Sequence, residues 1–117
     1  MVKIADLPEN NLFCPLPWLG AMVQPAGTFS SCCIQRDSET MRYSSMRGSS
    51  ISKVRNNEYW NGVRKDLIDG KQHPSCGNCW HMEDNNLRSQ RQGRIEEFNW
   101  MVPEIMQDLE INLDGTL

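Results

Sequence analysis

Five cysteines constrain this chain more than any other feature of its sequence. They stand at positions 14, 32, 33, 76 and 79 of 117 residues. Apolar residues make up 38% of the chain, so the core of a single domain of this length is thin. Such domains often need a disulfide, a metal or a partner for stability. Because the cysteine count is odd, the cysteines cannot all pair with one another within one chain.

The N-terminal segment and the charge restrict the compartment and the class of partner. The segment carries Asp6 and no long apolar run, so it does not resemble a secretory signal, and no stretch of the chain is long enough to cross a membrane. We therefore expect a cytoplasmic protein without a membrane partner, in which cysteines are metal ligands or redox groups rather than disulfides. The net charge of −3 argues against a nucleic-acid partner.

Cys76 and Cys79 form a CxxC pair where a helix is predicted to begin. Two intervening residues allow both sulfurs to face one metal, and a helix N-terminus favours the thiolate form. This pair supplies only half of a four-coordinate site, so Cys14, Cys32, Cys33 or a histidine must supply the rest. Neighbouring residues of a strand point to opposite faces, so Cys32 and Cys33 are not expected to bind the same centre. Cys14 lies before the same predicted hairpin and can approach Cys32.

The first half of the chain predicts a β-hairpin. Two β-compatible segments, 19–24 and 28–34, flank Pro25-Ala26-Gly27, in which proline fixes φ and glycine can adopt a positive φ. Residues 35–52 are rich in Ser, Arg and Gly and are expected to form a loop with little structure of its own.

The second half predicts two main helices. Asn56 or Asn57 caps the first, which begins near Glu58 and stops at Gly70. Its apolar face consists of Tyr59, Trp60, Val63, Leu67 and Ile68. The second helix is expected to run from about residue 74 to about residue 98, with interruptions at Gly93 and Pro103.

Together these patterns predict a small metal-stapled α+β domain, with a β-hairpin followed by two main helices around a four-cysteine site. We divide the chain into an irregular N-terminal lead-in (1–12), a metal-binding domain (13–100) and a C-terminal tail (101–117). The tail alternates apolar and polar residues but has no obvious strand to pair with.

A series of short motifs runs through residues 13–92. They are Cys14-Pro-Leu-Pro-Trp18, Pro25-Ala-Gly27, Trp60-Asn61, Arg64-x-Asp-Leu-x-Asp-Gly-Lys71, Pro74-x-Cys76-x-x-Cys79-Trp80 and Arg88-x-x-Arg91-Gln92. The most specific combination is Gly27-x4-Cys32 with Cys76-x2-Cys79. In these motifs, residues 13–92 resemble the SPASM/twitch auxiliary-cluster module of radical S-adenosylmethionine (radical SAM) proteins.

The resemblance implies that Cys14, Cys32, Cys76 and Cys79 bind a [4Fe–4S] cluster, which leaves Cys33 over. It also implies two partners. One is a radical SAM core, either downstream in the same chain or on another chain, and the other is a peptide or protein substrate. The cluster would then transfer electrons, help to dock the substrate or stabilise the fold. The CxxxCxxC motif of the radical SAM core is absent. We therefore expect no radical SAM activity from this chain alone, and interpret it as an accessory module or the front end of a longer protein.

Three alternatives stay open. Zinc binds the same four cysteines and would staple a protein-interaction domain without redox chemistry. The cysteines could instead be reduced core thiols, since free cysteine packs as a small hydrophobe. Cys76-Gly-Asn-Cys79 also fits a dithiol oxidoreductase, although that class expects a strand just before the first cysteine, where this chain has a turn. The residues alone favour iron–sulfur and zinc about equally, and the resemblance favours iron–sulfur.

The remaining candidate residues have structural interpretations. His73 and His81 flank the CxxC pair and are not expected to be ligands. Arg88, Arg91 and Arg94 recur at helical spacing. We expect most of them to form a solvated face paired with nearby glutamates, and a docking surface is the alternative. The tryptophans at positions 18, 60 and 80 are expected to be core aromatics that shield the metal from water.

Overall fold

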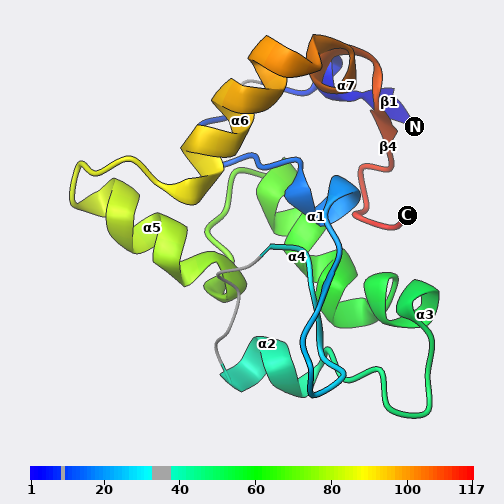
Figure 1. Ribbon diagram of the computed structural model, residues 1–117. Helices are drawn as coiled ribbons and strands as arrows, with labels where there is room; N and C mark the ends of the chain where they lie inside the picture. The colour runs from blue at the N-terminus through cyan, green and yellow to red at the C-terminus, as the bar shows by residue number, and fades with distance from the viewer. Residues whose placement is uncertain (9, 33–37) are drawn as a thin grey trace.

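The computed structural model describes residues 1–8, 10–32 and 38–117 as a small α+β protein, the predicted fold class (Figure 1). The described residues contain seven α-helices, two short 3-10 helices and two small antiparallel sheets. In chain order the elements are β1 (Val2–Lys3), η1 (Ile4–Asp6), α1 (Leu16–Leu19), β2 (Met22–Val23), β3 (Phe29–Ser30), α2 (Ser38–Arg42), α3 (Ile51–Arg55), α4 (Glu58–Ile68), η2 (Pro74–Cys76), α5 (Gly77–Asp84), α6 (Gln90–Met101), α7 (Pro103–Asp108) and β4 (Glu110–Ile111).

Helix α4 forms as predicted and contributes residues to both parts of the core. The Asn57 side chain caps it by accepting a hydrogen bond from the Trp60 backbone N–H at 2.9 Å. Gly70, with φ of 71°, follows the end of the helix. Trp60, Val63 and Leu67 are fully buried.

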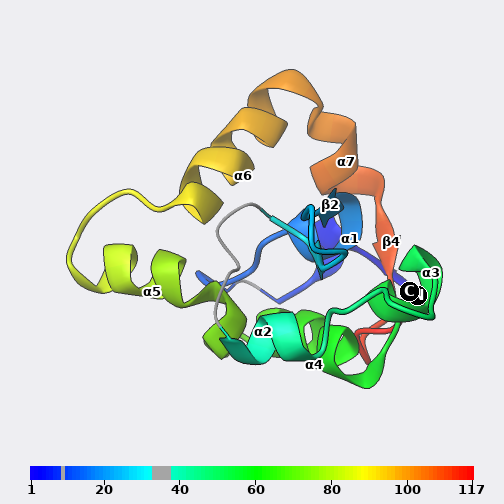
Figure 2. The same cartoon turned by 60° about the horizontal axis from the view of Figure 1, so that its bottom comes forward.

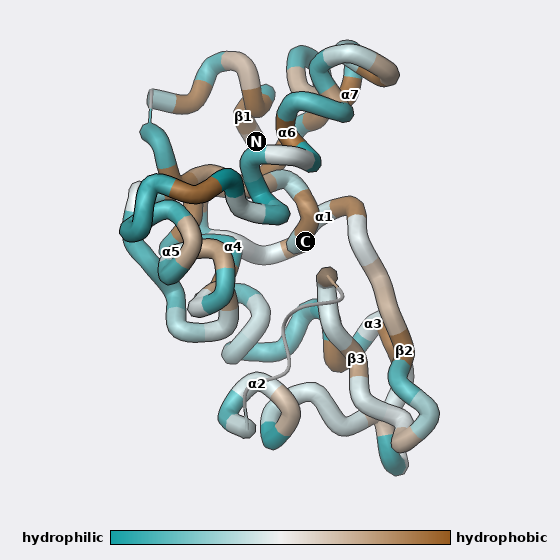
Figure 3. Tube along the Cα trace, turned by 60° about the vertical axis from the view of Figure 1, so that its left-hand side comes forward, coloured by the Kyte–Doolittle hydropathy of each residue, from teal (hydrophilic) through white to brown (hydrophobic). Residues whose placement is uncertain are grey.

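The predicted hairpin is present, with short strands. Met22 pairs with Ser30 and Val23 with Phe29, and Gly27 turns the chain with φ of 82°. Phe29 is buried in the core, whereas Met22 and Val23 of β2 are exposed. Figure 3 shows β2 and β3 side by side.

The N-terminal lead-in and the C-terminal tail pair with each other, which corrects two expectations. Val2 lies opposite Ile111 and Lys3 opposite Glu110, and the Ile4 N–H donates to the Leu109 carbonyl at 2.9 Å. The alternating tail therefore does have a partner strand, and the lead-in is not irregular. The pairing brings both ends of the chain together beside α7 (Figure 1).

The segment 35–52 is not simply a loop. Helix α2 begins at Ser38, and α3 begins at Ile51 with Ser50 as its cap. Thr40 of α2 is buried, and its hydroxyl lies 2.7 Å from the Tyr59 hydroxyl, so tertiary contacts stabilise a short helix that the polar sequence does not predict. The first part of this segment, up to residue 37, lies outside the described residues.

The prediction of a single long helix from residue 74 to residue 98 is wrong. Helix α5 ends at Asp84, and Asn86 adopts φ of 59°, a conformation that suits asparagine but ends a helix. Ser89 then starts α6 with a capping box completed by Gln92. Gly93 lies inside α6 rather than interrupting it, whereas Pro103 does begin a new helix as expected.

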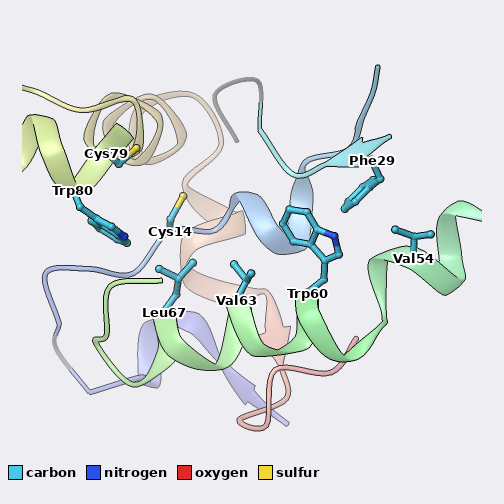
Figure 4. Packing of buried hydrophobic residues seen from close by; sticks show 8 residues of the cluster. All are labelled: Cys14, Phe29, Val54, Trp60, Val63, Leu67, Cys79 and Trp80. Atoms are coloured by element: carbon cyan, nitrogen blue, oxygen red, sulfur yellow. The ribbon is translucent and has the colours of Figure 1, made fainter. Parts of the chain in front are cut away.

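The core has two parts on different sides of α4. One cluster contains Cys14, Phe29, Val54, Trp60, Val63, Leu67, Cys79 and Trp80 (Figure 4). The other gathers Ile4, Phe13, Ile68 and Ile111, so it is built by the paired chain ends. Figure 4 shows Cys14 and Cys79 beside Trp80 at one end of the first cluster, away from Phe29 and Val54.

Buried Arg64 connects these parts through main-chain carbonyls. Its guanidinium donates to the carbonyls of Gly115, Pro17 and Arg55 and to the Asn61 side chain. Desolvation and the nearby Arg55 charge lower the pKa of Arg64 to about 10, so the group still carries its charge at neutral pH. A charge that is fully buried in this way requires such complete hydrogen bonding.

Candidate metal centre

The structure brings the four predicted ligand cysteines to one cavity. Cys14 precedes α1, Cys32 follows β3, Cys76 ends η2 and Cys79 lies in the first turns of α5. Leu16, Pro17, Ser31, Gln90 and Arg91 complete the lining. The cavity has a volume of about 20 Å³, which accommodates roughly one water-sized guest. Cysteines separated by up to 65 positions in the sequence therefore meet at one place.

The four thiols differ in exposure. Cys14 and Cys79 are buried, whereas Cys32 and Cys76 are half-buried, and all four are free of disulfide bonds. Cys33, which the sequence leaves over, lies outside the described residues. The described thiols thus form a site with a buried side and a side closer to solvent.

Burial strongly affects Cys14. Desolvation raises its pKa to about 12, and the proximity of Cys76, Cys32 and Cys79 adds to the increase, while the Leu16 backbone N–H opposes it. A thiol with such a pKa is protonated at neutral pH, and a metal cation favours the thiolate instead.

Cys79 has polar support as well as burial. Desolvation raises its pKa, the backbone N–H of Arg91 lowers it by hydrogen bonding, and the charge of Glu83 raises it. Hydrogen bonds to a sulfur are the usual means of orienting a metal-binding cysteine and tuning its centre.

Arg91 links the two buried cysteine segments. Its side chain donates to the Glu83 carboxylate from Nε and Nη2, and from Nη1 to the Phe13 carbonyl at 2.9 Å, next to Cys14. The Ser89 hydroxyl donates to the same carboxylate at 2.6 Å. One buried ion pair therefore fixes the start of α6 against α5 and against the Cys14 segment.

The expectation of a solvated arginine stripe is correct for two of the three arginines. Arg88 pairs with Glu96, and Arg94 pairs with Glu97 at 2.8 Å, both on the surface. Arg91 is buried instead, so that part of the expectation is wrong. The Ser89-x-x-Gln92 capping pattern is the sequence signal that could have located the start of α6 and the inward face of Arg91.

The aromatic residues surround the site unequally. Trp80 is buried beside Cys79, donates from Nε1 to the His73 carbonyl at 2.7 Å, and lies under the Arg91 guanidinium. Trp60 is buried in the same cluster, whereas Trp18 stacks on Phe13 in the other cluster. Trp80 packs with Cys14 and Cys79 in the core cluster, but none of these three tryptophans lines the cavity itself.

The two histidines do not line the cavity. His73 Nδ1 accepts a hydrogen bond from the Ser75 backbone N–H at 3.1 Å, and its ring meets the Tyr59 ring edge-on. His81 is exposed on α5. The segment before Cys76 contains a 3-10 turn rather than the strand that a dithiol oxidoreductase would place there.

A shallow groove adjoins the cavity at its exposed side. It shares Leu16, Ser31, Cys32 and Gln90 with the cavity and has a volume of about 270 Å³. Arg94, Glu97 and Phe98 of α6 form its far wall. Cys32 thus lies where the site meets the surface.

Four cysteine side chains are chemically suited to bind a metal as thiolates. Their present arrangement suits a metal less well. Four cysteines are the usual ligands of structural zinc and of iron–sulfur clusters. Within the described residues, however, no group of three or more His, Cys, Asp or Glu side chains is arranged to hold a metal ion. A multi-atom cluster would also require more room than this cavity of about 20 Å³ has.

No family model, curated protein or solved structure matches this chain. In the described part of the chain, no helix is long and apolar enough to span a bilayer.

Proposed function

We propose that Cys14, Cys32, Cys76 and Cys79 bind one [4Fe–4S] cluster and that the chain is an electron-transfer accessory of a radical SAM enzyme. The observation that carries the proposal is the shared cavity, which four cysteines from three separate segments line together. Buried core thiols without a role would not need to converge in this way. The sequence resemblance of residues 13–92 supports the choice of iron–sulfur over other metals.

In this proposal the protein binds, shields and orients the centre. Cys14 and Cys79 hold it on the buried side, where both pack in the core cluster with Trp80. The backbone N–H groups of Leu16 and Arg91 hydrogen-bond to these two sulfurs. Such bonds stabilise negative charge on sulfur and raise the reduction potential of a bound centre. A cluster held by four cysteines supplies one-electron transfer.

The proposed partner is a radical SAM core, on the same or another polypeptide, that modifies a peptide or protein. Cys32 adjoins the surface groove, so we place the path for electron exchange on that side of the site. The buried side is closed by α4, α5 and the start of α6. A partner that exchanges electrons with the centre would therefore approach over the groove, near Arg94 and Phe98.

Anaerobic reconstitution with ferrous iron and sulfide tests the binding proposal. The reconstituted chain should be brown, absorb broadly near 400 nm and contain about four iron and four sulfide per chain, in line with a four-iron cluster. Reduction with dithionite should bleach this absorption. A colourless protein with no sulfide after this treatment would contradict the proposal.

Zinc binding is the second candidate function, and the small cavity is the observation that favours it. A volume of about 20 Å³ suits a single ion better than a multi-atom cluster. In this case the site would staple an interaction domain without redox chemistry. Purification in zinc-containing medium should then give one tightly held zinc per chain that sulfide and ferrous iron do not displace.

A further inference from the structure

A second cleft lies on the surface and is lined by residues of α2, of the start of α4 and of the segment at the start of η2. Figure 2 shows α2 beside α4. It has a volume of about 560 Å³, far larger than the cysteine cavity, and shares no lining residue with it. Two tyrosines, two glutamates, an asparagine and a histidine form most of its lining: Tyr43, Tyr59, Glu39, Glu58, Asn57 and His73. The proposed metal centre does not use this cleft.

Aromatic rings form one wall of the cleft in a fixed arrangement. Tyr43 stacks on Tyr59 with ring centroids 5.1 Å apart, and His73 meets Tyr59 edge-on at 5.3 Å. Hydrogen bonds hold this wall in place, since the Tyr59 hydroxyl lies 2.7 Å from that of Thr40 and the Asn57 side chain donates to the Tyr43 carbonyl. The wall is therefore preorganised.

Two carboxylates complete the cleft. Glu39 lies in the first turn of α2 and Glu58 begins α4, and both side chains are exposed. Neither forms an ion pair with any residue that the structure describes. Acidic residues at helix starts are favoured by the helix dipole. That role leaves both charges available, and the two helices start at the same cleft.

One ring of this wall already contacts a guanidinium group of the chain itself. The guanidinium carbon of Arg42 lies 5.5 Å from the centroid of the Tyr43 ring, a cation–π distance. A guanidinium is planar, stacks on aromatic faces and donates two parallel hydrogen bonds to a carboxylate, whereas an ammonium does neither as well. Stacked tyrosines beside two carboxylates that form no ion pair with the described residues match these properties.

We infer that this cleft binds a guanidinium group, such as an arginine side chain of a peptide or a small guanidinium compound. The tyrosine wall supplies the stacking surface, and Glu39 and Glu58 supply the charge and the hydrogen-bond acceptors. The inference is independent of the metal that the cysteines bind.

Isothermal titration calorimetry on the full, anaerobically purified chain tests the inference. The probes are acetyl-Gly-Arg-Gly-amide, the same tripeptide with citrulline in place of arginine, and agmatine. Saturable binding of the arginine tripeptide, with at least tenfold weaker binding of the neutral citrulline tripeptide, is expected. If agmatine binds as tightly as the arginine tripeptide, the ligand is a small guanidinium compound. If agmatine binds more weakly, the ligand is a peptide.

Variants locate the binding to the cleft. The double substitution Glu39→Gln with Glu58→Gln should weaken the arginine tripeptide by about tenfold, because each exposed charge contributes a few-fold. Tyr43→Leu should weaken it about threefold or more through loss of the stacking face. Glu104→Gln, an exposed acid on α7, is the matched control and should leave affinity unchanged. No saturable binding, equal binding of the citrulline peptide, or an unaffected double variant would overturn the inference.

Discussion

Arg91 donates two hydrogen bonds to the carboxylate of Glu83, from Nε at 2.9 Å and from Nη2 at 2.5 Å, in the interior of the protein. Both side chains are largely buried, at 8% and 13% exposure. The same guanidinium reaches the Phe13 carbonyl beside Cys14, and the Arg91 backbone contacts Cys79. The pair therefore stabilises the fold at the point where the cysteine segments meet.

Replacement of Arg91 by methionine should lower the free energy of unfolding by about 3–5 kcal/mol, because the Glu83 charge is left buried without its partner. Arg94→Met is the matched control, since Arg94 pairs with Glu97 on the surface of the same helix and should cost less than about 1 kcal/mol. Urea unfolding followed by tryptophan fluorescence measures both. Equal losses in the two variants would show that the buried pair has no special role.

The same pair predicts how stability depends on pH. Partial burial raises the pKa of Glu83, but the hydrogen bonds from Arg91 and Ser89 and the Arg91 charge lower it by more, to below its ordinary value of 4.5. A folded-state pKa below the unfolded-state value stabilises the protein above pH 4.5. This contribution is lost as the pH falls through the lower, folded-state pKa.

The free energy of unfolding, measured in urea between pH 6 and pH 3, should therefore fall in the wild type. Glu83→Gln should be less stable at pH 6 and should lose less on acidification, because the substituted side chain does not titrate. Parallel curves for the two proteins would contradict the assignment of this pH dependence to Glu83.

Gly115 and Gly62 give a second matched pair. Gly115 has φ of 86°, and a Cβ there would lie 2.2 Å from the Asn61 carbonyl oxygen, while its own carbonyl accepts from Arg64. Gly115→Ala should therefore destabilise the protein by more than about 1 kcal/mol. Gly62 lies within α4 with no atom near its ideal Cβ, so Gly62→Ala should stabilise by about 0.5–1 kcal/mol. Thermal unfolding monitored by circular dichroism measures the unfolding midpoint of both variants. The two midpoints should shift in opposite directions, and similar shifts would contradict this prediction.

Local patterns predicted the elements whose signals lie within a few neighbouring residues. Asn57, the apolar face that includes Trp60, and Gly70 define α4 from start to end, and Pro25-Ala26-Gly27 defines the hairpin turn. The convergence of the cysteines on one cavity was also expected, because the CxxC pair needed partners from the first third of the chain.

Contacts between residues far apart in the sequence determine the structural features that local sequence patterns did not predict. The pairing of Val2 with Ile111 joins opposite ends of the chain, and no local pattern specifies it. The inward position of Arg91 depends on Glu83, on the other side of the turn at Asn86. Short helices such as α2 depend on contacts such as that of Thr40 with Tyr59, since a helix of five residues is too short to be stable by itself.

Iron and acid-labile sulfide per chain, measured after anaerobic reconstitution of the wild type, Cys32→Ala and Cys33→Ala, test the central claim most directly. The wild type and Cys33→Ala should each hold about four iron and four sulfide, and Cys32→Ala should lose most of both, since only Cys32 is proposed as a ligand. Equal loss in the two variants, or a wild type that holds zinc and no sulfide, would contradict it.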